Sequence, residues 1–283
     1  MSKTNAWIEW IKNYSNKELA ERKTWYGNVA EDYYRVRPRY PQEILNRVIE
    51  LSQLKSSAKI LELGCGPGIA TVPLAQLGFS LVSLEPNLEA ANLAKQHCVE
   101  YPNVTVINTT FEEWDGERES FDAVIATTSW HWIRSEIAYP KTYEVLNEQG
   151  HLILLWNTPP QLSYEQYQPL EPIYQALVPT MPIPARYETL ENQQSNFQYF
   201  GQEILGSGYF DSLSCDCKAY PLVYTIADYL ALLSTLSPYI ALEPETRRQL
   251  FSELAIKLLQ TGSDRLDLTY LSAFHVAQKK AFG

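Results

Sequence analysis

The sequence predicts an α/β protein in which helices cover both faces of an open, largely parallel sheet. Between residues 60 and 157, short apolar runs alternate with longer stretches in which apolar residues recur at helical spacing. The first of these runs breaks into a turn with glycine at positions 64, 66 and 68. The last, His151 to Asn157, is apolar at consecutive positions, which is typical of a strand buried on both faces.

Length and charge narrow the possible functions. A chain of 283 residues can bury a full core as one large domain, and no repeat or linker indicates a second one. The formal net charge of −10 argues against a nucleic-acid partner, because long-range attraction to phosphate needs a basic surface. No apolar run approaches the roughly 20 residues that cross a bilayer, so no membrane partner is expected.

The amino-terminal stretch and the cysteines indicate a cytoplasmic protein. The segment Ala6 to Lys12 is amphipathic and charged, unlike a secretory signal. The four cysteines have no metal-ligand spacing, so we expect reduced thiols and no metal site. They are Cys65, Cys98, Cys215 and Cys217.

The first forty residues predict helices followed by an extended path. Residues 1–25 have the pattern of one or two amphipathic helices, and we interpret the tryptophans of their apolar face as core packing. That face comprises Trp7, Ile8, Trp10, Ile11 and Leu19. Pro38 and Pro41 then disfavour helix in the residue before each of them. Pro41 is also a suitable opening for a helix from Gln42 to about Leu54.

The glycine-rich turn after the first strand, Ile60 to Leu63, predicts a ligand site. Glycine adopts backbone angles that other residues avoid and lets a ligand approach the main chain. A dinucleotide turn, G-x-G-x-x-G, would need glycine where this chain has Ile69. The departure favours a smaller nucleoside ligand over a pyrophosphate, and disfavours an NAD-dependent oxidoreductase. The alternative is a tight turn without a ligand in some other α/β protein.

The second strand, Phe79 to Leu84, follows a helix that ends at Gly78, and it carries an acidic residue at its end. Glu85 lies 21 residues after Gly64, where a carboxylate can accept hydrogen bonds from both ribose hydroxyls. Pro86 offers a flat apolar face for adenine. The alternative for Glu85 is a solvated acid in a loop.

The third and fourth strands place further polar residues at the same edge. A helix from Leu88 to Glu100 precedes the third strand, 104–108, and the fourth strand is 121–126. Because ligands bind outside the carboxyl ends of strands in open α/β sheets, Thr127, Thr128 and His131 are expected in the crevice. His131 could exchange a proton near neutral pH, or it could only shape the wall beside two tryptophans.

The remainder of the chain predicts a more elaborate second half. A helix from 137 to 146, closing at Gly150, precedes the fifth strand. Residues 158–210 are rich in proline and weakly periodic, which predicts an irregular excursion with short helices near 165–177. A strand (210–221), two helices (226–236 and 244–260) and a closing strand (266–277) follow.

Two patterns in the sequence resemble a known enzyme family. E-x-G-x-G-x-G at 62–68 resembles motif I of the class I S-adenosylmethionine-dependent methyltransferases. A-x-x-Y-x-x-x-R-P-x-Y-P at 30–41 and the His-Trp pair after the fourth strand resemble the trans-aconitate methyltransferase-like subfamily. The resemblance implies a Rossmann-like seven-stranded sheet of order 3-2-1-4-5-7-6, with its last strand antiparallel and the extra helices forming a cap.

The same resemblance implies how one domain, 1–283, is organised. Residues 1–41 would form helices and a segment that covers the cofactor, and 42–157 the nucleotide-binding core. Residues 158–265 would supply the cap insertions and sixth strand, and 266–283 the closing strand.

The resemblance further implies S-adenosyl-L-methionine as cofactor and methyl transfer to a small molecule. The cofactor-binding residues would be Tyr33, Arg37, Glu62, Gly64, Cys65, Gly66, Glu85, Pro86, Thr110, Phe111, Thr127, Thr128 and His131. Thr110 departs from the pattern, because many family members have an aspartate there for the adenine amine, and Phe111 takes the following apolar place.

The acceptor decides which residues the proposed chemistry needs. O-methylation of a carboxylate or hydroxyl is favoured. A carboxylate needs no base and would be held by a cation such as Arg37 or Arg186, whereas a phenol or amine would favour His131 as a catalytic base. The alternative function is a nucleoside-binding regulatory protein without turnover, which only the substitution at Thr110 supports.

Overall fold

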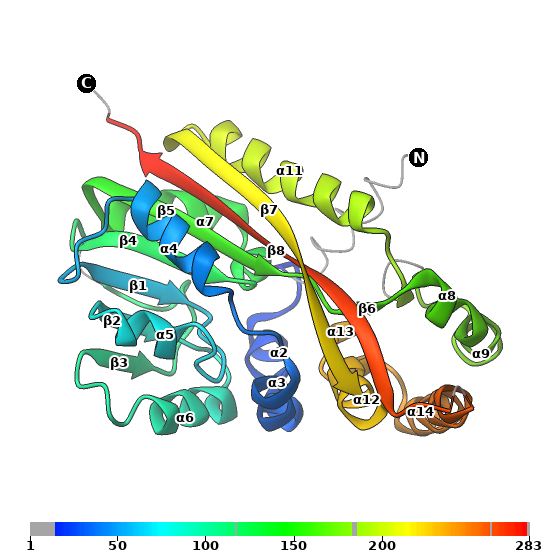
Figure 1. The fold of residues 1–283 in the computed structure, drawn as a ribbon. Helices are drawn as coiled ribbons and strands as arrows, with labels where there is room; N and C mark the ends of the chain where they lie inside the picture. The colour runs from blue at the N-terminus through cyan, green and yellow to red at the C-terminus, as the bar shows by residue number, and fades with distance from the viewer. Residues whose placement is uncertain (1–14, 117, 183–185, 261, 282–283) are drawn as a thin grey trace.

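The computed structural model describes residues 15–116, 118–182, 186–260 and 262–281, and these form an eight-stranded mixed sheet with helices on both faces (Figure 1). The strand order is β3-β2-β1-β4-β5-β8-β6, and β7 pairs with β8. The strands are β1 (Lys59–Leu63), β2 (Ser80–Leu84), β3 (Val104–Ile107), β4 (Phe121–Thr127), β5 (Leu146–Asn157), β6 (Gln161–Leu162), β7 (Phe210–Thr225) and β8 (Arg265–Lys279). The predicted sixth and seventh strands are β7 and β8, so the predicted order is confirmed.

The directions of the strands determine at which edge of the sheet the candidate site lies. The pairs β1–β2, β1–β4, β2–β3 and β4–β5 are parallel, and β8 is antiparallel to its neighbours. Parallel neighbours need crossover helices. Here these helices are α5 (Thr71–Gln76), α6 (Leu88–His97) and α7 (Ser135–Val145). The carboxyl ends of β1, β2 and β4 therefore meet at one edge of the sheet.

Further helices precede the sheet and follow it. The amino-terminal elements are α2 (Leu19–Thr24), η1 (Gly27–Val29), α3 (Ala30–Val36) and α4 (Gln42–Leu51), and η2 (Trp130–Trp132) follows β4. The second half adds α8 (Tyr164–Tyr167), η3 (Gln168–Leu170), α9 (Glu171–Leu177), α11 (Leu190–Gly206), α12 (Ile226–Ser234), α13 (Ser237–Ile240) and α14 (Pro244–Leu259). In Figure 1, β7 and β8 run past the rest of the sheet towards α12 and α14.

Buried side chains form a layer on each face of the sheet and a separate core in the cap. Leu61 faces one layer and Ile60 the other, as alternation along a strand requires. The cap core lies between α9, α12 and α14, and it includes Tyr174 and Tyr239, whose hydroxyls are 2.9 Å apart. Val36 of α3 belongs to the same cluster, so the amino-terminal segment packs directly on the cap.

The predicted irregular excursion at 158–210 is wrong in its second half, where α11 runs for 17 residues. The Thr189 hydroxyl caps this helix by accepting a hydrogen bond from the Asn192 N–H at 3.3 Å. Its buried stripe includes Phe197, Phe200 and Ile204 at spacings of three and four. The glutamines and asparagines between them conceal that period in the sequence.

Two other boundaries differ from the prediction. The helix expected to close at Gly150 ends at Val145, because β5 already begins at Leu146 and an irregularity in its register with β4 absorbs the intervening residues. Residues 30–36 form a helix, so the extended path begins only at Arg37. The predicted tryptophan face at residues 7–11 lies outside the described residues. None of the helices described here is both long and apolar enough to cross a membrane.

Candidate functional site

A cavity opens at the edge where β1, β2 and β4 end. Its wall combines the glycine turn, the ends of β2 and β4, the segment after β3 and the amino-terminal helix α2. A smaller cavity adjoins it and shares lining residues with it: Tyr33, Gly64, Gly66, Thr127 and Thr128. The predicted segments therefore converge on one place.

The glycine turn leaves space where a side chain would stand. Gly64 and Gly66 have φ angles of +65° and +55°, which L-residues rarely adopt. A Cβ at Gly64 would lie 2.7 Å from the Ser129 Cβ, so a side chain cannot fit there. A Cβ at Gly66 would meet no atom within 4 Å, and Gly66 lines both cavities. The main chain at Gly66 is thus open to a ligand.

Glu85 stands beside this turn. One of its carboxylate oxygens accepts a hydrogen bond from the Gly66 N–H and the other from the Asn87 N–H, each at 2.8 Å. A carboxylate offers about four lone-pair sites, so acceptor capacity remains for a vicinal diol. Burial raises the pKa of Glu85 to about 7, although the two backbone hydrogen bonds oppose that shift. The chemistry of this group fits a ribose, which donates from two adjacent hydroxyls.

Glu62 lies behind the turn and outside the lining of both cavities. One oxygen accepts hydrogen bonds from the hydroxyls of Thr71 at 2.7 Å and Ser83 at 2.8 Å; the other has no hydrogen-bond partner within the described part of the chain. Burial raises its pKa to about 7. Glu62 thereby joins β1 to α5 and β2. The buried Cys65 lines the smaller cavity, and burial raises the pKa of its thiol.

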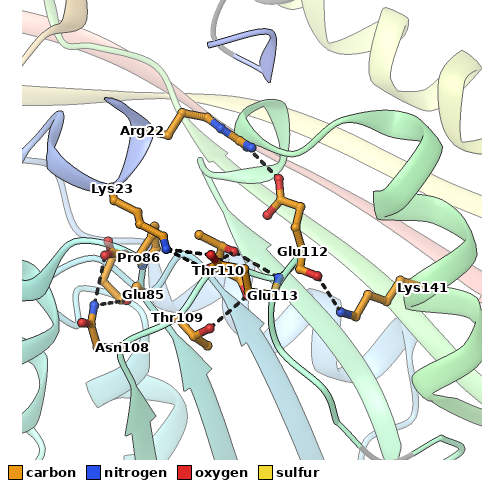
Figure 2. A network of polar contacts seen from close by, with 10 residues as sticks. All are labelled: Arg22, Lys23, Glu85, Pro86, Asn108, Thr109, Thr110, Glu112, Glu113 and Lys141. Carbon is orange, nitrogen blue, oxygen red and sulfur yellow. Dashed lines mark hydrogen bonds and ion pairs between the residues drawn. The ribbon is translucent and has the colours of Figure 1, made fainter. Parts of the chain in front are cut away.

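The segment after β3 forms the wall opposite Glu85. The Thr110 hydroxyl donates to the Glu113 carboxylate at 3.1 Å and accepts from the Glu113 N–H at 3.2 Å, so it caps the local turn. Lys141 donates from α7 to the carbonyls of Phe111 at 2.7 Å, Glu112 at 3.3 Å and Trp114. Figure 2 shows the contacts of Thr110 with Glu113 and of Lys141 with Glu112.

The backbone after β2 is also fixed. Asn108 donates from its side-chain amide to the carbonyls of Glu85 at 2.9 Å and Pro86 at 3.0 Å (Figure 2). Pro86, Thr110 and Phe111 all line the larger cavity. An apolar ring surface and a flat proline thus face the same space as Glu85.

Thr127 and Thr128 line both cavities at the end of β4. Thr128 has a φ of +57°, an uncommon conformation for a β-branched residue. Its hydroxyl lies 2.8 Å from the Tyr40 hydroxyl and accepts from the Asn157 N–H at 3.2 Å. These contacts hold the strained residue in place, as is common beside ligand sites.

Tyr33 and Arg37 reach the smaller cavity from α3 and the segment after it. Arg37 donates from Nε to the Thr235 hydroxyl and from Nη2 to the Thr235 carbonyl, both at 2.9 Å, and its guanidinium lies 4.7 Å from the centroid of the Tyr33 ring. Arg186, the other candidate anion-binding residue, lines neither cavity. It donates instead to the carbonyls of Val178, Pro179 and Met181.

His131 is not among the residues that line the two cavities; its neighbours Trp132 and Ile133 line the larger one. The imidazole stacks on Trp156, with ring centroids 6.0 Å apart and 29° between the planes. Burial lowers the pKa of His131 to about 4, so the ring is neutral at pH 7.

Sequence reasoning missed the contribution of α2 to the cavity. Leu19 and Arg22 of α2, and Tyr26 just after it, line the larger cavity. Leu19 and Arg22 are three residues apart and so lie on one face of α2, and that was the available signal. Arg22 pairs with Glu112 at 2.8 Å, and both side chains are about nine-tenths buried. Within the described ranges, no group of three or more His, Cys, Asp or Glu side chains could hold a metal ion.

Residues 60–150 match the family model described as "Methyltransferase domain". An uncharacterized methyltransferase of Mycobacterium tuberculosis is 30% identical over 133 residues, which cover 47% of this chain and 52% of the relative. The mitochondrial ubiquinone biosynthesis O-methyltransferase of Mus musculus is 34% identical over 115 residues, covering 38% of this chain and 31% of that protein. The matches to the mycobacterial relatives thus span about half of those relatives' length.

Solved structures share the fold. A proposed Type II methyltransferase from Anaeromyxobacter dehalogenans superposes with a TM-score of 0.62 at 19% identity, covering 86% of this chain and 97% of that one. Phosphoethanolamine N-methyltransferase 2 of Haemonchus contortus, solved with phosphomonomethylethanolamine and S-adenosylhomocysteine, gives 0.52 at 14% identity, covering 93% of this chain and 59% of that one. At these identities the likeness concerns the fold alone.

Proposed function

We propose that the whole chain transfers a methyl group to a small-molecule acceptor. The premise is that residues 60–150 are a class I S-adenosylmethionine-dependent methyltransferase domain. S-adenosyl-L-methionine is the cofactor of this domain, and when bound it supplies a methyl group already activated on a sulfonium. The protein has to align the acceptor with that methyl for an in-line displacement and to exclude water.

The placement of Glu85 carries this proposal. A buried carboxylate that already holds the Gly66 N–H, next to a turn with room for a ligand, is suited to a ribose diol. We assign the sugar to Glu85 and the adenine to the surfaces of Pro86, Thr110 and Phe111. The methionine end is assigned to the smaller cavity, whose candidate residues are Tyr33, Arg37, Gly64, Cys65, Gly66, Thr127 and Thr128. Glu62 would act from behind by fixing the turn.

O-methylation of a carboxylate or hydroxyl is the favoured reaction. Among the described residues that line the two cavities there is neither histidine nor lysine, which suits an acceptor that needs no base. A carboxylate is such an acceptor, because its oxygen is already ionised at neutral pH. For a hydroxyl acceptor the proposed base is His131, whose lowered pKa makes it a weak one. The net charge of −10 favours a small molecule over a nucleic acid.

The proposed organisation is one functional unit, 1–283, in which the amino-terminal segment covers the cofactor. Its support is that α3 joins the cap core through Val36 and that α2 lines the cavity through Arg22. The amino-terminal segment thus contacts both the cavity and the helices of the second half.

Calorimetric titration with S-adenosylhomocysteine tests the cofactor site. We expect saturable binding that Glu85→Gln weakens, whereas the matched surface variant Glu100→Gln binds like the wild type. Absence of binding in the folded wild-type protein would contradict the proposal. Transfer of labelled methyl from S-adenosylmethionine into a deproteinised small-molecule extract then tests turnover.

The alternative is a regulatory protein that binds the cofactor without turning it over. The observation that favours it is the engagement of the Thr110 hydroxyl by Glu113, which occupies a group expected to face adenine. Saturable cofactor binding without labelled product in any extract fraction would support this alternative over transfer.

A further inference from the structure

Arg22 is a buried cation on the wall of the larger cavity. It lies on α2, and its side chain is 9% exposed. The neighbouring wall is aromatic and aliphatic, formed by Leu19, Tyr26, Trp132 and Ile133. Within the described part of the chain, no other arginine or lysine lines this cavity. Glu112, which pairs with Arg22, lines the same cavity, so this ion pair lies beside a surface suited to an apolar ligand body.

The contacts of Arg22 in the described residues are made by Nη1. Nη1 donates to the Trp132 carbonyl and lies 2.8 Å from a carboxylate oxygen of Glu112. Nε is buried and has no hydrogen-bond partner in the described residues. A buried donor without a partner is unfavourable, so the guanidinium keeps donor capacity that its protein contacts do not use. Nε and Nη2 form the edge of the guanidinium that binds a carboxylate through two parallel hydrogen bonds.

Arg37 and Arg186, the two arginines that the sequence suggested for binding an anionic acceptor, make hydrogen bonds to other parts of the protein. Arg37 donates hydrogen bonds from Nε and Nη2 to Thr235. Arg186 binds main-chain carbonyls and lines neither cavity. Arg22 is thus better placed to meet an anionic group in the larger cavity.

We infer that Arg22 is a specificity-determining residue that binds a carboxylate of the methyl acceptor, while Glu112 and the Trp132 carbonyl hold Nη1. This inference rests on the proposed transfer reaction and specifies its substrate class: an acceptor with a carboxylate and an apolar body that contacts Tyr26 and Trp132. Arg22 orients the acceptor and takes no part in bond making.

Charge-separated acceptors test the inference. A deproteinised extract of the cells that make the protein is divided by anion exchange into an anionic fraction and a neutral-plus-cationic fraction. Each is incubated with the wild-type protein and S-adenosylmethionine labelled in the methyl group. We expect label in acceptors of the anionic fraction. Label in the neutral-plus-cationic fraction alone overturns the role of Arg22 and leaves the proposed function standing. No label in either fraction, with S-adenosylhomocysteine still bound, overturns the transfer reaction and this inference with it.

Variants of the ion pair then separate acceptor binding from a structural role. Arg22→Met should raise the KM for the anionic acceptor by about 10- to 100-fold. Arg22→Lys keeps the positive charge but loses the planar guanidinium, so its KM should lie between the values of the wild type and of Arg22→Met. The affinity for S-adenosylhomocysteine should stay unchanged in both. Glu112→Gln removes a competing carboxylate and should lower that KM about twofold to fivefold.

The matched control is Lys23→Met. Lys23 lies on the same helix and pairs with Glu113 at 2.7 Å, but its side chain is more exposed and lines neither cavity. Its KM should equal the wild-type value. If Arg22 only ties α2 to the wall, Glu112→Gln raises the KM as Arg22→Met does. That result, or an Arg22→Met variant with wild-type KM, overturns the inference.

Discussion

Replacing Glu85 by glutamine should weaken cofactor binding in a way that depends on pH. The carboxylate accepts from the N–H groups of Gly66 and Asn87, and its remaining lone pairs are assigned to the ribose diol. Glutamine keeps one acceptor oxygen and places an NH₂ group where an acceptor is needed. Losing charge-assisted hydrogen bonds of about 1.5–3 kcal/mol corresponds to a Kd for S-adenosylhomocysteine raised by about 10- to 100-fold.

The pH profile makes this prediction sharper. Burial raises the pKa of Glu85 to about 7, so at lower pH the carboxyl must lose a proton before it can accept from both hydroxyls. The wild-type Kd should therefore rise towards about tenfold per pH unit below that pKa, and the Glu85→Gln Kd should not change with pH through this group. Calorimetry at pH 6, 7 and 8 measures both profiles, with Glu100→Gln as the control that keeps the wild-type profile. A Glu85→Gln variant that binds within twofold of the wild type at pH 8 would refute the ribose assignment.

Three further changes test the surroundings of the cavity. Burial raises the pKa of Glu62 from 4.5 to about 7, so its contribution to stability is present below pH 4.5 and lost as pH rises through 7. Glu62→Gln should therefore recover up to about 3 kcal/mol of unfolding free energy at pH 8 relative to pH 4. Equal effects of the substitution in denaturant titrations at the two pH values would contradict this. Gly66→Arg should abolish binding of S-adenosylhomocysteine in calorimetry because the side chain enters the cavity, whereas Gly206→Arg, also in open space but outside the site, should bind normally. Lys141→Met leaves the carbonyls of Phe111, Glu112 and Trp114 without this donor and should lower the unfolding free energy by about 1–3 kcal/mol. The calorimetric affinity should become severalfold weaker, and an unchanged affinity would show that the wall does not need Lys141.

The part of the cavity beside the glycine turn could be predicted because local backbone requirements define it. A turn that needs positive φ at Gly64 and Gly66 requires glycine at those positions, and the end of a buried strand places Glu85 next to it. Sequence spacing reports both directly. The strand order was expected from the family resemblance, which rests on the motif at this same turn.

The other half of the cavity depends on contacts between distant segments. Arg22 meets Glu112 across 90 residues, and nothing near Arg22 distinguishes it from a surface arginine. The helix α11 was missed for a related reason, because tertiary packing of Phe197 and Phe200 outweighs its many polar residues. Such residues are recognised only when their partners are in place.

The end of β4 shows why position along the chain does not determine which side chain faces the ligand. His131 follows that strand closely, yet the 3₁₀ turn from Trp130 to Trp132 directs successive side chains differently. Trp130 packs into the core, His131 stacks on Trp156, and Trp132 lines the cavity. Because of this short helical turn, the aromatic Trp132 lines the cavity and the titratable His131 does not. Arg22 donates to the Trp132 carbonyl at this same wall, which favours our proposal that the cavity orients an acceptor that is already ionised and does not remove its proton.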